Sequence, residues 1–284
     1  MSGLTGVART RENALKAIFG RESGVLIGVV HLAPLPGAPD HSGHEVEPIY
    51  ERGLADARVY AQAGFDGLIV ENHGDIPFSK PGDLGPETAA HMAVVCDRIR
   101  RETGLPMGVN VLANGALPAL AIASASGARF IRINQWANAY VANEGLIEGA
   151  AATALRYRRA LGAQDVRIFA DAHVKHGAHA IVQDRPVAEL VRDVEFFNAD
   201  AVIATGQRTG HAADLGYIES LKAATTLPTL VGSGVTAENV ESLLAIVGGV
   251  IVASSLKVDG GWWNPVDSAR AETFVARARQ PYGR

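Results

Sequence analysis

The sequence of 284 residues has a single cysteine, no strong excess of one charge and no long apolar run. With only Cys96 present, an intramolecular disulfide and a zinc site built from several thiolates are both excluded. The net charge of −4 argues against a nucleic-acid-binding protein, because such domains are usually strongly basic. Apolar stretches such as VLIGVV have only strand length, and the polar N-terminus has no signal-peptide pattern. We therefore expect no nucleic-acid partner, no integral membrane segment and a cytoplasmic location.

A repeated alternation of short apolar runs with longer Ala-rich segments organises the chain. The runs lack polar–apolar alternation, as expected for parallel strands that are covered on both faces. Eight strand–helix units in about 250 residues fit the size of a (β/α)8 barrel. The eight predicted strands are Gly24–Val30, Gly67–Glu71, Met107–Leu112, Arg129–Asn134, Val166–Asp171, Ala201–Thr205, Thr229–Gly232 and Val250–Ala253.

Helices are predicted between these strands and after the last one. They are expected at Pro48–Gln62, Thr88–Thr103, Ala116–Ser126, Glu144–Leu161, Val187–Asn198, Leu215–Ala224, Ala237–Ile246 and Asp267–Arg279. We interpret residues 1–284 as one α/β domain, a single (β/α)8 TIM barrel, with an N-terminal helical extension over about residues 1–22 that covers the barrel bottom. A doubly wound open sheet is the alternative, but no GxGxxG motif follows the first strand.

Two loops after the last two predicted strands suggest an anion site. Gly232-Ser233-Gly234 follows the seventh strand, and Ser254-Ser255 follows the eighth. Glycines let backbone N–H groups approach a ligand closely, and barrels often bind phosphate between these two loops. Thr236–Asn239 resembles the start of a helix, whose N-terminus would favour an anion. The alternative is that the glycines form only a tight turn.

Polar side chains at the other strand ends complete the predicted site, because catalytic groups of this fold come from the C-terminal ends of the strands. Glu71 and Asp171 suit general acid–base chemistry, although a structural carboxylate paired with Arg132 or Lys175 is equally open. The predicted catalytic residues are Glu71, Asp171, His173 and Lys175. The predicted substrate- and phosphate-binding residues are His31, Asn110, Arg132, Asn134, Thr205, Gly232, Ser233, Gly234, Ser254, Ser255 and Lys257.

Lysines and histidines leave further alternatives open. Lys175 and Lys257 could form a Schiff base, although pairing with an anionic substrate is the better expectation. His173, His176 and His179, with His31, His73, Asp171 and His211, could assemble a divalent metal site. Because no short metal motif is present, histidines hydrogen-bonded in a polar pocket are the better expectation, and no metal ligand or cofactor is assigned.

The chain resembles the BtpA/SgcQ family from about Ile18 to Arg270. The stretches that carry the resemblance are FGRESGVLIGVVHLAPLPGAP, GFDGLIVENHGDIPF, PMGVNVLANGA, GARFIRIN, VRIFADAHVKH, ADAVIATGQRTG, PTLVGSGVTAENV and SSLKVDGGWWNPVD. The resemblance implies a (β/α)8 barrel. It implies no catalytic role, because the family names come from a factor needed for photosystem I accumulation and from members encoded beside sugar-uptake genes.

These observations predict an enzyme acting on a phosphorylated sugar or sugar-like metabolite, as an isomerase, a lyase or a glycosidic hydrolase. The alternative is a non-catalytic assembly or regulatory factor that binds a phosphorylated ligand or a protein partner. A nucleotide phosphohydrolase is a weaker possibility, because the sequence has no P-loop. Barrels of this kind often self-associate, so a homo-oligomer is possible.

Overall fold

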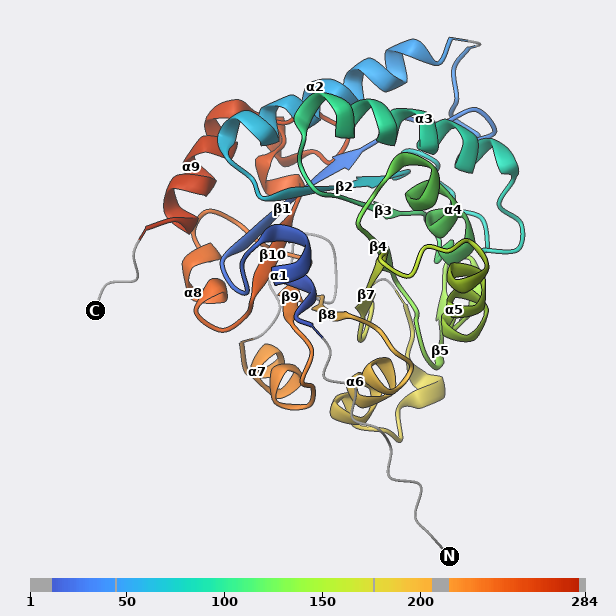
Figure 1. Cartoon of the computed structure of the whole chain (residues 1–284), viewed down its shortest axis with the longest axis vertical. Helices are drawn as coiled ribbons and strands as arrows, with labels where there is room; N and C mark the ends of the chain where they lie inside the picture. Colours follow the sequence, from blue (N-terminus) through green and yellow to red (C-terminus); the bar gives the residue numbers. More distant parts are fainter. Residues whose placement is uncertain (1–11, 44, 176, 206–214, 281–284) are drawn as a thin grey trace, which may run out of the picture.

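The computed structural model describes residues 12–43, 45–175, 177–205 and 215–280. Eight parallel strands close into a barrel, in the order β1-β10-β9-β8-β7-β4-β3-β2 (Figure 1). This confirms the predicted (β/α)8 barrel and rules out the open sheet. The barrel strands are β1 Val25–His31, β2 Gly67–Glu71, β3 Met107–Asn110, β4 Phe130–Ile133, β7 Arg167–Asp171, β8 Ala201–Ala204, β9 Thr229–Val231 and β10 Gly249–Val252.

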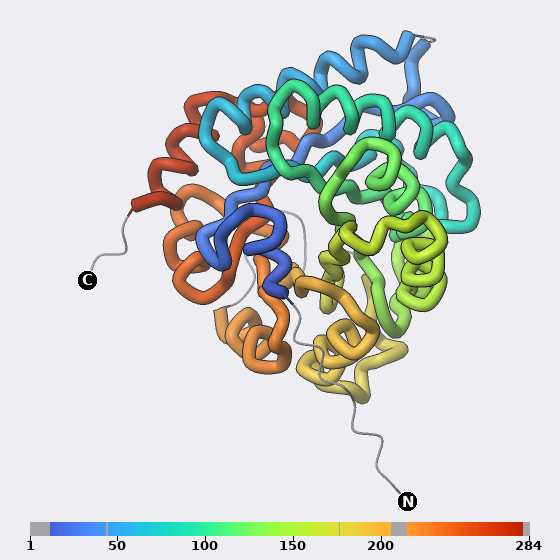
Figure 2. Tube along the Cα trace, in the orientation of Figure 1, coloured from blue at the N-terminus to red at the C-terminus, as the bar shows by residue number. Residues whose placement is uncertain are grey.

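The surrounding helices follow the predicted order and form the outer layer of the fold (Figures 1 and 2). They are α2 Glu47–Ala63, α3 Pro86–Thr103, α4 Ala116–Ser126, α5 Ala151–Ala160, α6 Val187–Phe196, α7 Leu215–Ala223, α8 Val240–Leu244 and α9 Ser268–Ala278. Short 3-10 helices lie at η1 Ala180–Val182, η2 Ser254–Leu256 and η3 Val258–Gly260. Several helices end at a left-handed residue that turns the chain back toward the next strand, among them those followed by Gly64, Gly104, Gly127 and Asn198.

The barrel interior is filled by every second residue of the strands, because successive side chains of a strand point to opposite faces. Val25, Ile27 and Val29 of β1 belong to one buried apolar cluster with residues of the other strands, such as Ile69 and Phe169. The same period places the last residue of β1, His31, above Val29 and toward the C-terminal mouth. An apolar interior therefore ends in a polar layer at the mouth.

Helix α1 (Ala14–Phe19) covers the opposite end of the barrel (Figure 1). Ala14, Leu15 and Ile18 are buried in the same cluster as the barrel interior. Asn13 begins the helix, since its side-chain oxygen accepts hydrogen bonds from the backbone N–H groups of Leu15 and Lys16. The predicted helix at the barrel bottom is thus present within residues 12–20. The assignment of residues 1–284 to one domain with an extension over residues 1–22 stays a prediction.

One predicted helix is partly wrong. The predicted helix Glu144–Leu161 begins only at Ala151, and a hairpin of β5 Ala139–Ala142 and β6 Gly145–Glu148 precedes it. A two-residue turn joins these strands, and Gly145 directly after it has a left-handed backbone with φ of 100°. Tyr140 and Ile147 are buried and pack with Val174 beyond β7, so tertiary packing holds this segment as strands.

The predicted helix Ala237–Ile246 is also shorter than expected, because α8 begins at Val240. The side chain of Asn239 accepts a hydrogen bond from the backbone N–H of Thr236 at 2.8 Å and donates one to the carbonyl oxygen of Gly234, also at 2.8 Å. These bonds hold residues 236–239 in a turn. The expectation that Thr236–Asn239 starts a helix behind the anion loop is therefore wrong, and a helix N-terminus has no part in the site described below.

Candidate functional site

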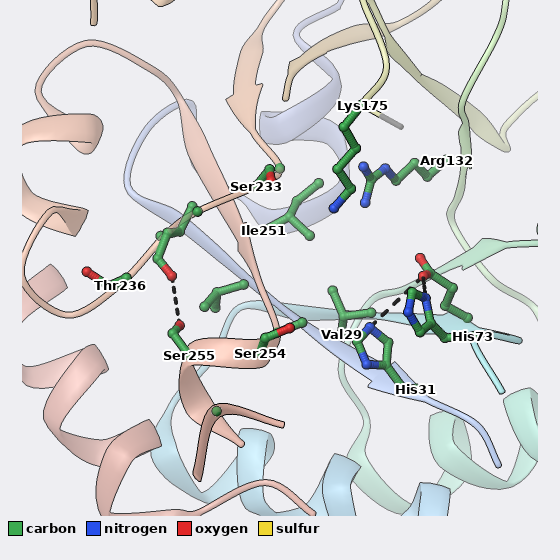
Figure 3. A pocket seen from close by; sticks show the side chains of 17 residues that line it. Val29, His31, His73, Arg132, Lys175, Ser233, Thr236, Ile251, Ser254 and Ser255 are labelled. Carbon is green, nitrogen blue, oxygen red and sulfur yellow. Dashed lines mark hydrogen bonds and ion pairs between the residues drawn. The ribbon is translucent and has the colours of Figure 1, made fainter. Parts of the chain in front are cut away.

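A cavity of about 250 Å³ opens at the C-terminal ends of the strands (Figure 3). The loops after β9 and β10 form one side of it, and side chains from β1, β2 and β4 and from the segment after β7 form the other. Of the residues predicted from the sequence, the cavity is lined by His31, Glu71, Arg132, Lys175, Gly232, Ser233, Gly234, Ser254 and Ser255. The fold thus brings both predicted loops and several predicted polar groups to one cavity.

The two loops are fixed to each other and to their own chain. The Ser255 hydroxyl donates a hydrogen bond to the carbonyl oxygen of Val235 at 2.7 Å, which joins the loop after β10 to the loop after β9. Asn239 fixes the β9 loop from behind, and Gly234 has a left-handed backbone with φ of 66°, which favours glycine. The loops are therefore pre-shaped without a ligand.

Backbone donors in these loops are open to a ligand. Within the described part of the chain, no group accepts a hydrogen bond from the backbone N–H of Gly234, Val235, Ser254 or Ser255, although all four residues line the cavity. Buried or half-buried N–H groups usually find an acceptor. An anion with several oxygens would satisfy such a set of donors.

Two cationic side chains line the same cavity, those of Lys175 and Arg132 (Figure 3). The Arg132 guanidinium lies beside the β9 loop, since a Cβ placed on Gly232 would lie 3.4 Å from Arg132 Nη2. Burial lowers the pKa of Lys175, as does the neighbouring Arg132, while the carboxylates of Glu71 and Asp171 oppose the shift. The lysine therefore loses its proton more readily than a lysine in water.

Opposite the loops, Glu71 forms a polar cluster with two histidines. Its Oε1 lies 2.8 Å from His73 Nδ1 and 4.0 Å from His31 Nε2, and its Oε2 accepts a hydrogen bond of 2.7 Å from the side chain of Asn110. The two imidazole rings stack with centroids 4.5 Å apart. The backbone carbonyl of Trp262 lies 3.2 Å from His31 Nδ1.

The charge states in this cluster follow from burial and from the neighbours. Burial alone would raise the pKa of Glu71, but the hydrogen bond from His73 and the charges of His73, His31 and Arg132 bring it well below its usual range. Burial lowers the pKa of His31 to about 3. At neutral pH the cluster therefore combines an ionised carboxylate with a neutral His31 imidazole.

The structure pairs the carboxylate of Asp171 with Arg132, as the structural alternative stated above expects. Its side chain is fully buried and does not line the cavity. Both of its oxygens lie 3.2 Å from nitrogens of Arg132, and Asn134 donates a further hydrogen bond to Asp171 at 3.1 Å. Asp171 therefore holds Arg132, and the acid–base role predicted for it stays a prediction.

Lys257 also differs from its predicted role. Its side chain is buried, and its ammonium group pairs with the carboxylate of Asp56 on α2. The second carboxylate oxygen of Asp56 accepts a hydrogen bond from the backbone N–H of Val266 at 2.8 Å. Lys257 does not line the cavity, so the structure gives it the task of fixing the loop after β10 to α2.

Four further predicted residues do not line the cavity, namely Asn110, Asn134, Thr205 and His173. Asn110 and Asn134 hold Glu71 and Asp171, and each keeps a buried Oδ1 without a partner among the described residues. The Thr205 hydroxyl donates to the carbonyl oxygen of His173 at 2.9 Å. The direct contacts with a substrate predicted for these residues stay predictions.

The predicted histidine set is divided by the fold. His173 stacks on His179 with ring centroids 3.7 Å apart, while His176 and His211 lie outside the described residues. Among the described residues, the group whose ligand atoms lie close enough to share one ion, within 4.8 Å of one another, is His31, Glu71 and His73. The structure thus brings two histidines of the suggested metal set, His31 and His73, together with Glu71, which was not in that set.

Two contributors, His73 and Trp262, are not among the predicted catalytic or substrate-binding residues, although His73 was named for a possible metal site. His73 lines the cavity, and the signal was its position two residues after Glu71, on the same side of an extended chain. Trp262 lies in the segment after β10 and has no role in the sequence-based prediction. Its carbonyl contacts His31 and its ring packs edge-on against His73 with centroids 4.5 Å apart, which the sequence had no local pattern to indicate.

Comparison with known proteins identifies the family. The BtpA family model matches residues 22–280. The chain belongs to the BtpA family. It is 40% identical over 250 residues to an uncharacterized protein of Pyrococcus furiosus, covering 88% of this chain and 93% of the relative. It is 39% identical over 251 residues to the photosystem I biogenesis protein BtpA of Synechocystis, covering 88% and 86%.

Solved structures with a similar fold are much more distant in sequence. The thiamine phosphate pyrophosphorylase of P. furiosus has a TM-score of 0.55 and 14% identity, covering 93% of this chain and 99% of that one. The N-(5'-phosphoribosyl)anthranilate isomerase of P. furiosus has a TM-score of 0.56 and 15% identity, covering 90% and 99%. At these identities the likeness shows the barrel fold alone.

The described residues contain no helix with the length and apolar character needed to cross a bilayer. A relative from Caenorhabditis elegans, 36% identical over 256 residues and covering 88% of this chain and 91% of its own, is named an uncharacterized mitochondrial protein. The cytoplasmic location of this chain, the lack of a nucleic-acid partner and self-association stay predictions.

Proposed function

We propose that this BtpA-family protein is an enzyme acting on a phosphorylated sugar or sugar-like small metabolite. The main observation behind this proposal is that two pre-shaped loops with open N–H groups line the same cavity as Glu71, Lys175 and Arg132. The phosphate would lie between the loops after β9 and β10, where barrels often bind one. The names of the two similar barrels from P. furiosus also refer to phosphorylated small molecules.

The reacting part of the substrate would face the opposite wall of the cavity. Ser233, Gly234 and Ser254 would hold the phosphate, and Lys175 and Arg132 would neutralise charge. Lys175, whose pKa is lowered toward neutrality, would exchange a proton with the substrate, and Glu71, ionised and held by Asn110, would accept a hydrogen bond from a substrate hydroxyl. Among the predicted reactions, this arrangement favours isomerisation or aldol-type cleavage, because two-carboxylate glycosidic hydrolysis needs a second carboxylate facing the cavity and Asp171 does not supply it.

The test is a thermal-shift screen of phosphosugars, each paired with its dephosphorylated form. A ligand that binds only the folded state raises its stability by mass action. We expect one phosphorylated compound to raise Tm while its neutral counterpart does not. Ser233→Leu should abolish this shift by filling the phosphate position, and Ser220→Leu, on the exposed face of α7, should keep it. Shifts only with neutral sugars would contradict the proposal.

A second candidate is the non-catalytic assembly factor, which the name of the Synechocystis relative favours. Such a factor needs the anion loops but no proton transfer. Once a ligand is found, turnover of that ligand by the wild type and its loss in Glu71→Gln with retained binding would support the enzyme. Binding without turnover, unchanged in Glu71→Gln, would support the factor.

A further inference from the structure

The ends of β1 and β2 bring three ligand-bearing side chains to one point. His31 and Glu71 are the last residues of these strands and are direct register partners, so their side chains leave the sheet on the same side. His73 follows two residues after Glu71. Their ligand atoms lie within 4.8 Å of one another, and all three line the cavity that holds the anion loops.

We propose that His31, Glu71 and His73 bind a divalent transition-metal ion that faces the anion loops. Two imidazole nitrogens and one carboxylate oxygen form a set that zinc, iron(II), cobalt(II) or manganese(II) accepts, whereas magnesium prefers oxygen ligands. Three protein ligands leave further positions for water or substrate, as in catalytic metal sites. The inference deepens the proposed function, on which any catalytic use of the ion rests, although ion binding is measured without a substrate.

The orientation of His31 supports the assignment. A carbonyl oxygen only accepts hydrogen bonds, so the contact between His31 Nδ1 and the carbonyl of Trp262, at 3.2 Å, places the ring hydrogen on Nδ1. Nε2 then carries the free electron pair, 4.0 Å from Glu71 Oε1. Metal-binding histidines almost always have their second ring nitrogen fixed in this way.

A hydrogen bond also fixes the orientation of the Glu71 carboxylate. Asn110 donates to Glu71 Oε2 at 2.7 Å, which leaves Oε1 toward both histidines. His73 Nδ1 lies 2.8 Å from this Oε1, a contact that fits either a hydrogen bond or two neighbouring ligands of one ion. The buried Arg132 is already paired with Asp171, so Glu71 is not needed to balance that charge.

Ion binding would change the roles in the cavity. Glu71 would hold the ion in place of a substrate hydroxyl, and Lys175 would remain the cavity residue that can exchange a proton. The ion would face the same 250 Å³ space as the open N–H groups of the β9 and β10 loops. A phosphorylated substrate would then have its anionic end at the loops and a polar oxygen toward the ion.

The test is calorimetric titration of the chelator-treated protein with Zn²⁺, Mn²⁺ and Mg²⁺, without any phosphorylated compound. We expect one Zn²⁺ or Mn²⁺ per chain and no comparable binding of Mg²⁺. Asn110→Ala should weaken Zn²⁺ binding roughly 10–100-fold, the usual effect of removing an outer partner, and His73→Ala and Glu71→Gln should weaken it further. His91→Asn, in which the changed residue contacts Tyr50 outside the cavity, is the matched control.

The outcomes separate this inference from the proposed function. Ion binding lost in His73→Ala and Glu71→Gln but kept in Ser233→Leu would support the site, even if no phosphorylated compound binds. Wild-type Zn²⁺ affinity equal to that of His73→Ala would overturn it, even if a phosphosugar still raises Tm. If His73→Ala does not fold, as judged by circular dichroism, the comparison of the wild type with Asn110→Ala decides in the same way.

Discussion

At the residue scale, Asp171 and Lys257 are charged residues at or just after strand ends, and their side chains form buried ion pairs. Each was predicted to meet a substrate, and each is instead buried against an opposite charge, Arg132 for Asp171 and Asp56 for Lys257. Removing one partner of a buried pair leaves an uncompensated charge, which costs more than the intact pair contributes. We therefore expect substitutions at either residue to lower stability, whereas a substitution of a catalytic group would lower turnover.

Asp171→Asn should lower the free energy of unfolding by about 3–5 kcal/mol, because the guanidinium of Arg132 would stay buried without its counter-charge. Urea denaturation followed by circular dichroism measures this. Asp184→Asn, at an exposed position, is the control and should stay close to the wild type. If Asp171→Asn is as stable as the wild type but has lost turnover, the result would contradict this prediction and support the catalytic role first expected for Asp171.

Lys257→Met should destabilise the protein by a similar amount, about 3–5 kcal/mol, since Asp56 would keep a buried charge. The double variant with Asp56→Asn should recover most of this loss, because no unpaired charge remains. Unfolding midpoints in urea for the two single variants and the double variant give the coupling. Equal stability of all three with weakened binding of a phosphorylated ligand would show that Lys257 contacts the ligand.

At the scale of the element, β1 packs so closely on α2 that a glycine is required. A Cβ on Gly28 would lie 2.5 Å from the ring of Tyr60, whose hydroxyl donates to the carbonyl of Val29. We expect Gly28→Ala to destabilise the fold by about 1–3 kcal/mol through overpacking. Gly82→Ala, where no atom lies within 4 Å of the added Cβ, should change stability little. Equal denaturation curves for both would contradict this packing.

The sequence predicted the barrel strands well because each is a continuous apolar run bounded by polar or glycine residues, which a doubly covered parallel strand requires. It missed the hairpin at residues 139–148, whose strands are held by burial of Tyr140 and Ile147 against Val174. That contact joins segments far apart in the chain, so local pattern favoured a helix. The predicted start of α8 was also wrong, because the side chain of Asn239 donates a hydrogen bond back to the carbonyl oxygen of Gly234.

The sequence predicted where the candidate site lies better than it predicted which of its side chains pair with one another. The strand ends had to meet at one mouth, so Ser233, Ser254, Glu71 and Lys175 were expected together, and they line one cavity. Which acid would pair with which base depends on side-chain direction across neighbouring strands. Asp171 could have faced Glu71 or Arg132, and in the folded barrel it pairs with Arg132.

At the scale of the whole molecule, stability should fall in mild acid through His173. Burial, together with the neighbouring His179, lowers the pKa of His173 to about 4, against about 6.5 in an unfolded chain. The unfolded state binds more protons between these values, so this contribution is complete above about pH 6.5 and is lost as the pH falls toward 4. Tyr140, stacked on His179, completes this packing.

His173→Gln should therefore lose less stability than the wild type between pH 7 and pH 5. Because His173 is only partly buried, we expect a difference of only roughly 1–3 °C in the change of Tm. Thermal unfolding at both pH values measures it, with His41→Gln as a control on another part of the mouth. A wild-type Tm that falls no more than that of His173→Gln would contradict the lowered pKa.

The net charge of the chain is −4, yet the cavity presents Lys175, Arg132 and open N–H groups, so an anion is favoured locally against the overall charge. The most direct test is a crystal grown without phosphate or sulfate and soaked in tungstate, a tetrahedral anion with strong scattering. We predict an anion between the β9 and β10 loops, within hydrogen-bond distance of the N–H groups of Gly234 and Ser254, and its loss in Ser233→Leu. Tungstate bound elsewhere, with nothing between these loops, would contradict the account.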